Sequence, residues 1–159
     1  MNDQNAFINW LVDRAQITDV ITSYAVFTDA RDWKRWGDLM TDDVALDLGV
    51  AGSFTGRENV VKFVADGLTD IDRTQHLIAM PDIKIDNDKA HVRAVLQTLH
   101  VVYKADDGAD LSLLGHGAYD FDFVRTATGW KIARAANDVF NFVGDPHGRA
   151  SARPARKSS

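Results

Sequence analysis

Positions that would share one face of a helix recur at steps of three and four over the first thirty residues. The set comprises Phe7, Trp10, Leu11, Arg14, Ile17, Ile21, Tyr24, Ala25 and Thr28. This spacing predicts one long amphipathic helix whose apolar stripe packs on the rest of the protein.

Two shorter helices follow. Asp32 is a suitable N-cap for a helix through Trp33, Trp36 and Leu39. Residues 41–43 (Thr-Asp-Asp) predict a turn before a strand at 44–48, and residues 49–56 predict a loop or hairpin. Residues 57–68 carry valines and a phenylalanine at helical spacing and predict the third helix.

Beyond residue 73 the hydrophobic period changes from helical spacing to two. Alternation predicts a strand at 74–85 that is broken near Pro81, followed by strands at 90–104, 111–126 and 130–143. Turns at 106–108 (Asp-Asp-Gly) and 126–129 (Thr-Ala-Thr-Gly) connect them. Helices followed by long strands predict an α+β fold, in which a curved, cone-shaped antiparallel sheet packs against the long helix and the two shorter ones. The open end of such a cone is a natural place for a small-molecule pocket.

Composition and charge narrow the classes of protein. The 159 residues suit one domain over 1–145, and the chain has no cysteine for a disulfide or a thiolate site. Residues 146–159 form a basic tail that we expect to be disordered. The last eleven residues carry four of the basic side chains and no acid, so the body of the chain is more acidic than the net charge of −5. An acidic body argues against nucleic acid as a partner. Without an apolar run of transmembrane length or a basic signal sequence, we expect no membrane association and a cytoplasmic protein.

Asp29 stands in the last turn of the long helix, where a negative charge opposes the helix dipole at a cost of about 0.3–1 kcal/mol. Helix stability therefore does not account for it. Tyr24 and Asp29 lie about 140° apart on the helix and flank its apolar stripe, so both could face whatever covers that stripe. The alternative is an acid at a frayed helix end that faces water.

His76 shares a strand face with Thr74, Ile78 and Met80. An inward-facing imidazole is a potential general base, and a carboxylate on its other nitrogen would fix the tautomer. The alternative is a core histidine that is bonded to a backbone carbonyl.

His100 and Tyr119 are further candidates for the wall of a pocket. His100 is the only ionisable group on one face of the strand 90–104 before Lys104, and Tyr119 lies on an apolar face with Leu113 and Phe121. The opposite face of 90–104, with His91 and Arg93, is expected to meet solvent or another subunit. The sequence has no phosphate-binding loop, nucleophile elbow or zinc helix, and its histidines lack local metal-ligand spacing. We therefore expect no metal site.

The motifs together resemble the SnoaL-like family of the nuclear-transport-factor-2-like superfamily. The likeness rests on Tyr-Ala near the end of a long helix, Asp29, Arg31-Asp-Trp, Gly56-Arg-Glu and Arg73-Thr-Gln-His-Leu-Ile78, and on a closing Gly129-Trp-Lys-Ile. It spans residues 8–144. The hexapeptide at 73–78 is similar to scytalone dehydratase, and the spacing from Tyr24 to Asp29 is similar to bile acid dehydratases. Hexachlorocyclohexane dehydrochlorinase shares the Asp–His pair.

The resemblance implies a catalytic dyad of Asp29 and His76. In those relatives the histidine removes a proton from carbon, the aspartate holds the histidine, and a leaving group departs from the neighbouring carbon. Tyr24 would assist as an electrophile and His100 would line the pocket. Thr28 and Leu48 stand where scytalone dehydratase has its two substrate-binding tyrosines. The resemblance further implies no cofactor and a homo-oligomer, with a trimer favoured over a dimer.

The leading prediction is a cofactor-independent lyase, most simply a dehydratase, that acts on a small hydrophobic cyclic substrate of polyketide, steroid or aromatic type. An isomerase or cyclase would use the same base without a leaving group. A non-catalytic binding domain would keep the dyad as a polar pocket floor. An accessory subunit would dock a larger partner through Val101 and Tyr103.

Overall fold

The computed structural model describes residues 2–49, 52–103 and 111–144. Its elements, in chain order, are α1 (Asn2–Asp29), α2 (Trp33–Asp38), β1 (Met40–Asp47), β2 (Ser53–Thr55), α3 (Arg57–Gly67), β3 (Arg73–Asp86), β4 (Lys89–Val102), β5 (Leu111–Thr126) and β6 (Gly129–Gly144). The predicted α+β class is confirmed. The predicted turn at 106–108 and the predicted tail at 146–159 lie outside the described residues.

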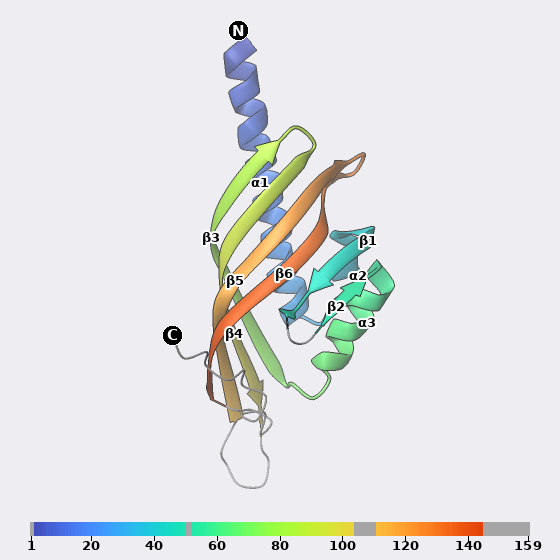
Figure 1. Cartoon of the computed structure of the whole chain (residues 1–159), viewed down its shortest axis with the longest axis vertical. Coiled ribbons are helices and arrows are strands. Elements are labelled where there is room, and N and C mark those ends of the chain that lie inside the picture. Colours follow the sequence, from blue (N-terminus) through green and yellow to red (C-terminus); the bar gives the residue numbers. More distant parts are fainter. Residues whose placement is uncertain (1, 50–51, 104–110, 145–159) are drawn as a thin grey trace.

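The strands form a curved, unclosed sheet in the order β2-β1-β6-β5-β4-β3. β3 to β6 are a long antiparallel meander, and α1 crosses the sheet diagonally (Figure 1). β1 pairs with β6 in parallel, which the antiparallel prediction did not include. β2, α2 and α3 lie together beside β1, on the side of the sheet away from β3.

The core forms between α1, α2 and the inner face of the meander. Ile17, Ile21 and Tyr24 of α1 contact an inner face that alternates along every strand, and Trp36 of α2 is fully buried among them. The largest fully buried side chains from the sheet are Met40, Leu46, Leu96, Phe121, Phe123 and Ile132. Burying each removes apolar surface from water and stabilises the fold by about 1.5–3 kcal/mol.

The N-terminal part of α1 differs from the prediction. Phe7, Trp10 and Leu11 are 57%, 40% and 45% exposed, because this part of α1 projects beyond the end of the sheet (Figure 1). The apolar residues of the predicted stripe are therefore buried only in the second half of the helix, from Ile17 onward. Periodicity reports which face is apolar but not where the covering sheet ends.

One strand boundary was predicted wrongly, and one predicted break is a milder irregularity within a strand. The expected turn at 41–43 lies inside β1, which begins at Met40, and the register with β6 shifts between Met40 and Ala45. β3 is not broken at Pro81 but runs through it, with a register shift between Ala79 and Asp82. Met80 lies in that irregularity with φ 50° and is 77% exposed, so it does not share the inward face of His76.

Candidate functional site

Asp29 is the last residue of α1, and no basic side chain lies in that last turn to offset the helix dipole. β3 supplies the hydrogen-bond donors instead. The Thr74 hydroxyl donates to Asp29 Oδ1 at 2.9 Å, and the His76 backbone N–H donates to Oδ2 at 2.9 Å. His76 Nδ1 lies 2.6 Å from Oδ1. The carboxylate is therefore docked onto the first residues of β3 and does not face water at a frayed helix end.

The environment of this pair shifts the acid toward its ionised form. Burial raises the pKa of Asp29, but the hydrogen bond from the His76 ring opposes it, helped by the His76 backbone N–H, the imidazole charge and the Thr74 hydroxyl. The net effect lowers the pKa of Asp29 below its ordinary value. An ionised Asp29 accepts hydrogen bonds only, so the neutral imidazole must carry its proton on Nδ1. Nε2 is then the basic nitrogen.

The strand registers place His76 in a row across the inner face of the sheet. Its partners in successive strands are Thr98, Gly115 and Phe142. Thr74 and His100 form the adjacent pair, and the rings of His76 and His100 lie 6.0 Å apart between centroids. Alternation in β3 and β4 thus brings the two predicted histidines to one face, as the sequence indicated.

Glycines shape this part of the inner face. A Cβ on Gly115 would lie 2.8 Å from Thr98 Oγ1, and a Cβ on Gly117 would lie 2.2 Å from the Asp138 carbonyl oxygen. No side chain fits at Gly117 without a backbone shift, because β6 bulges against it there. Gly115 lies opposite Thr98 and Gly117 opposite Leu96, so β5 carries no side chain in the row of His76 or at the next position of the inner face.

Tyr24 and Tyr119 form a buried phenol pair, and Asn137 lies beside it. Tyr24 is 3% exposed and packs edge-on against Tyr119 at 5.6 Å between ring centroids. Asn137 of β6 is the register partner of Tyr119. Burial raises the pKa of both phenols, so both are protonated donors at neutral pH. The negative charge of Asp29 also raises the pKa of Tyr119.

Asn137 was missed in the sequence, although a signal for it exists. It is the register partner of Tyr119, and the inward set of β6 around it is otherwise apolar. A polar residue within an apolar alternating set is the same signal that singled out His76.

The remaining predicted site residues are placed less directly. Thr28 is 3% exposed, and its hydroxyl donates to the Tyr24 carbonyl oxygen at 2.7 Å within α1. Leu48 follows β1, is half-buried and packs against the core cluster. Neither has a direct contact with the dyad among the hydrogen bonds of the described residues.

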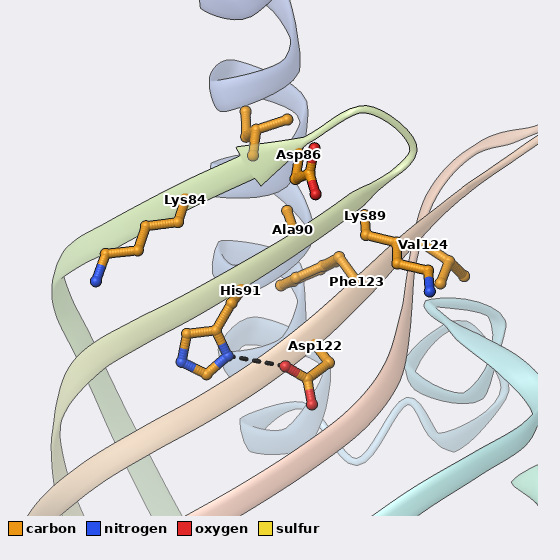
Figure 2. A pocket seen from close by; sticks show the side chains of 9 residues that line it. Lys84, Asp86, Lys89, Ala90, His91, Asp122, Phe123 and Val124 are labelled. Carbon is orange, nitrogen blue, oxygen red and sulfur yellow. Dashed lines mark hydrogen bonds and ion pairs between the residues drawn. The ribbon is translucent and has the colours of Figure 1, made fainter.

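A second Asp–His pair lies on the opposite face of the sheet. His91 Nδ1 is 2.8 Å from Asp122 Oδ1, beside an open groove of about 490 Å³ (Figure 2). The groove is lined by Lys84, Ile85, Asp86, Lys89, Ala90, His91, Asp122, Phe123 and Val124.

Burial distinguishes the two pairs. The side chains of His91 and Asp122 are 48% and 44% exposed, against 8% for His76 and 25% for Asp29. Water screens an exposed pair and solvates any charge that forms on it. Only the inner pair therefore has the shielding that a carbon-proton base requires.

The described part of the chain offers no other evident chemistry. Within it, no three His, Cys, Asp or Glu side chains are grouped so that they could hold a metal ion. None of the helices among these residues combines the length and apolar character needed to cross a membrane.

Comparisons with known proteins agree with the fold. The family model of the SnoaL-like domain matches residues 10–136. An uncharacterised protein of Mycobacterium tuberculosis, Rv2910c, is 27% identical over 123 residues, which are 77% of this chain and 82% of that protein.

Among solved structures, the Kfla4162 protein of Kribbella flavida is 24% identical with a TM-score of 0.77, over 83% of this chain and 93% of that one. A hexachlorocyclohexane dehydrochlorinase of Novosphingobium barchaimii is 18% identical with a TM-score of 0.76, over 88% and 94%. A scytalone dehydratase-like protein of Novosphingobium aromaticivorans is 22% identical with a TM-score of 0.74, over 94% and 99%. At these identities the structural likeness shows a shared fold.

Proposed function

Because the chain belongs to the SnoaL-like domain family, whose fold it shares with proteins named as a dehydrochlorinase and as dehydratase-like, we propose that it is a cofactor-independent lyase. The proposed reaction is a dehydration of a small hydrophobic cyclic substrate of polyketide, steroid or aromatic type. The observation that carries the proposal is the partly buried contact of 2.6 Å between His76 Nδ1 and Asp29 Oδ1.

In the proposed reaction His76 Nε2 removes a proton from the carbon next to a carbonyl group. The electrons of the broken C–H bond form a carbon–carbon double bond, and the hydroxyl on the neighbouring carbon leaves. The imidazolium returns its proton to the departing oxygen, so water is released and the enzyme regains its starting state. Asp29 remains ionised and stabilises the imidazolium while it exists.

The phenols supply the electrophilic side of the reaction. Both Tyr24 and Tyr119 are protonated, and negative charge that develops on a substrate oxygen would be stabilised by a hydrogen bond from such a donor. Tyr24 is 3% exposed and packs against the rings of Trp36, Tyr119 and Phe121. In the proposal Tyr24 assists beside Tyr119 as the second phenol donor, and His100 borders the substrate beside His76.

The experiment offers a panel of cyclic β-hydroxy ketones to the protein in D₂O. Dehydration lowers the product mass by that of one water, whereas isomerisation or cyclisation leaves the mass unchanged apart from deuterium. Exchange of the carbon-bound hydrogen with solvent reports the base in either case. A domain that only binds its ligand would give neither signal.

Two substitutions test the dyad, and the outer pair supplies matched controls. We expect His76→Gln and Asp29→Asn to lower turnover by about 10³-fold or more, because they remove the base and the group that holds it. His91→Gln and Asp122→Asn remove an Asp–His pair of similar geometry on the other face and should leave turnover unchanged. An active His76→Gln protein would exclude the mechanism.

A further inference from the structure

The connector between α1 and α2 contains a strained arginine beside the dyad. Arg31 has φ 58°, in the left-handed region that residues other than glycine rarely adopt. Such a conformation is strained and persists only where surrounding contacts enforce it.

The Arg31 guanidinium makes those contacts. Nη1 donates to the Thr28 carbonyl oxygen at 2.9 Å and to Thr74 Oγ1 at 2.7 Å, and Nη2 donates to the Ile71 carbonyl oxygen at 3.2 Å. One side chain thereby joins the end of α1, the segment before β3 and the start of β3 itself. These are the elements whose relative position sets the distance between Asp29 and His76.

Hydrogen-bond direction gives Arg31 a second effect. A guanidinium has only donors, so the Thr74 hydroxyl must accept from Arg31. The single hydroxyl proton of Thr74 is then free to point at Asp29 Oδ1, 2.9 Å away. Because the Thr74 hydroxyl donates this hydrogen bond, Asp29 is held as an acceptor. His76 must then donate from Nδ1, which leaves Nε2 as the basic nitrogen.

We propose that Arg31 and Thr74 are positioning residues that fix the orientation and ionisation of the Asp29–His76 dyad through a directed chain of hydrogen bonds. The inference deepens the proposed function and depends on it only for the dyad's role as a base. Neither residue reaches the reacting atoms. Their effect is on the carboxylate and, through it, on the imidazole.

Other charged or titratable groups near the dyad come from several elements. They are His100 on β4, Tyr119 on β5, and Arg31 itself in the connector after α1. Thr74 is the cross-strand partner of His100, whereas Arg31→Met leaves that pair in place. A change in the ionisation of Asp29 that appears in both the Thr74 and the Arg31 variants is therefore assignable to the chain of hydrogen bonds.

The first experiment follows the Asp29 carboxyl carbon by ¹³C NMR during a pH titration, with no substrate present. Thr74→Val keeps the shape of the side chain but removes the donor, so we expect it to raise the pKa of Asp29. Thr74→Ser keeps the hydroxyl and should restore the wild-type titration. Arg31→Met should raise the pKa of Asp29 because the cation is lost and the Thr74 proton loses its direction.

Arg73→Met is the matched control for Arg31→Met. Arg73 precedes Thr74 but lies on the exposed outer face of β3, so the same loss of charge there should leave the Asp29 titration unchanged. Arg31→Lys separates charge from geometry. It keeps the cation but lacks the planar fork that contacts three acceptors, so we expect a partial effect.

The second experiment measures steady-state kinetics of the same variants on a turned-over substrate. Loss of one hydrogen bond worth about 1.4 kcal/mol in the transition state lowers kcat about tenfold. We expect Thr74→Val to show that loss with little change in KM, and Thr74→Ser to recover it.

The outcomes separate this inference from the proposed function. An unchanged Asp29 titration in both Thr74→Val and Arg31→Met would overturn the positioning role, whatever the activity. A merely structural role would lower the melting temperature of those variants without moving the titration. Full activity in His76→Gln would instead refute the lyase, while the NMR result would still decide the hydrogen-bond chain.

Discussion

Three hydrogen bonds to Asp13 set the loss of stability that we expect when its charge is removed. Asp13 lies in the first half of α1 and is nearly buried against the sheet. Arg125 donates to it twice, from Nη1 to Oδ1 at 2.6 Å and from Nη2 to Oδ2 at 2.7 Å. The indole N–H of Trp130 donates to Oδ1 at 3.1 Å. This clamp fixes α1 on β5 and β6, sixteen residues before the helix delivers Asp29 to the site.

The perturbation is Asp13→Asn, which keeps the shape and removes the charge. Breaking a fully buried ion pair costs about 3–5 kcal/mol. The Arg125 side chain is 36% exposed and keeps Asp88 as a partner at 2.9 Å, so the cost here must be smaller. We expect a loss of about 2 kcal/mol in the free energy of unfolding at pH 7, the range for hydrogen bonds to charged groups.

The pH dependence of that loss follows from the ionisation of Asp13. The hydrogen bonds from Arg125 lower the pKa of Asp13 against the opposing effect of burial, and Trp130 and the arginine charge lower it further. A lowered pKa in the folded state gives stability that is complete above the unfolded value of about 3.9. The contribution disappears as the pH falls through the folded value.

Urea unfolding followed by tryptophan fluorescence measures the difference between wild type and Asp13→Asn at several pH values. The difference should be constant from pH 7 to about pH 5 and should shrink below about pH 4. Asp19→Asn, at an exposed site on the same helix, is the control and should change little. A difference that persists unchanged at pH 3, or an equal loss in Asp19→Asn, would refute the assignment to the ionised clamp.

Three further outcomes are expected. Gly117→Ala should lower the free energy of unfolding in urea by about 3 kcal/mol or more, because its Cβ would lie 2.2 Å from the Asp138 carbonyl oxygen. Gly67→Ala is the control, since a Cβ at Gly67 meets open space and should not lower the stability. Tyr119→Phe should lower kcat in steady-state assays by about tenfold, since it removes the phenol placed nearest the substrate in the proposal. We propose a homo-oligomer, with a trimer favoured over a dimer. Val95 is 48% exposed on the outer face of β4, and Val95→Lys should shift the sedimentation of the protein toward the monomer.

Much of the fold follows from local pattern. The strands after residue 73 were predicted to within about two residues at each end, because alternation with period two is set by the pleat itself. The irregularity at 40–45 was not foreseen, and the break predicted near Pro81 is a register shift between Ala79 and Asp82 within a continuous strand. They depend on how one strand's register meets its neighbour's, which is a tertiary property.

In the candidate site, too, some residues could be predicted from local sequence and others depend on tertiary contacts. Asp29 was singled out as a candidate because its charge conflicts with the helix dipole, and His76 because it interrupts a mostly apolar alternating face, whereas their pairing was implied only by the family resemblance. The signals that singled out the two residues are both local. The role of Arg31 was not visible, since its contacts join residues 40 and 43 positions apart in the chain and require a backbone conformation that the sequence does not announce.

Asp29 joins the function of the site to the stability of the fold. An acid at the end of a helix costs about 0.3–1 kcal/mol. The folded protein nevertheless lowers the pKa of Asp29, so it favours the ionised carboxylate more than the unfolded chain does. The donors of β3 therefore more than offset the dipole, and this stability is present above about pH 3.9 and lost as the pH falls through the folded value. The dyad is thus part of the packing between α1 and β3. Because Asp29→Asn removes a stabilising charge together with the support of the base, its turnover has to be compared with wild type well below the melting temperature of the variant.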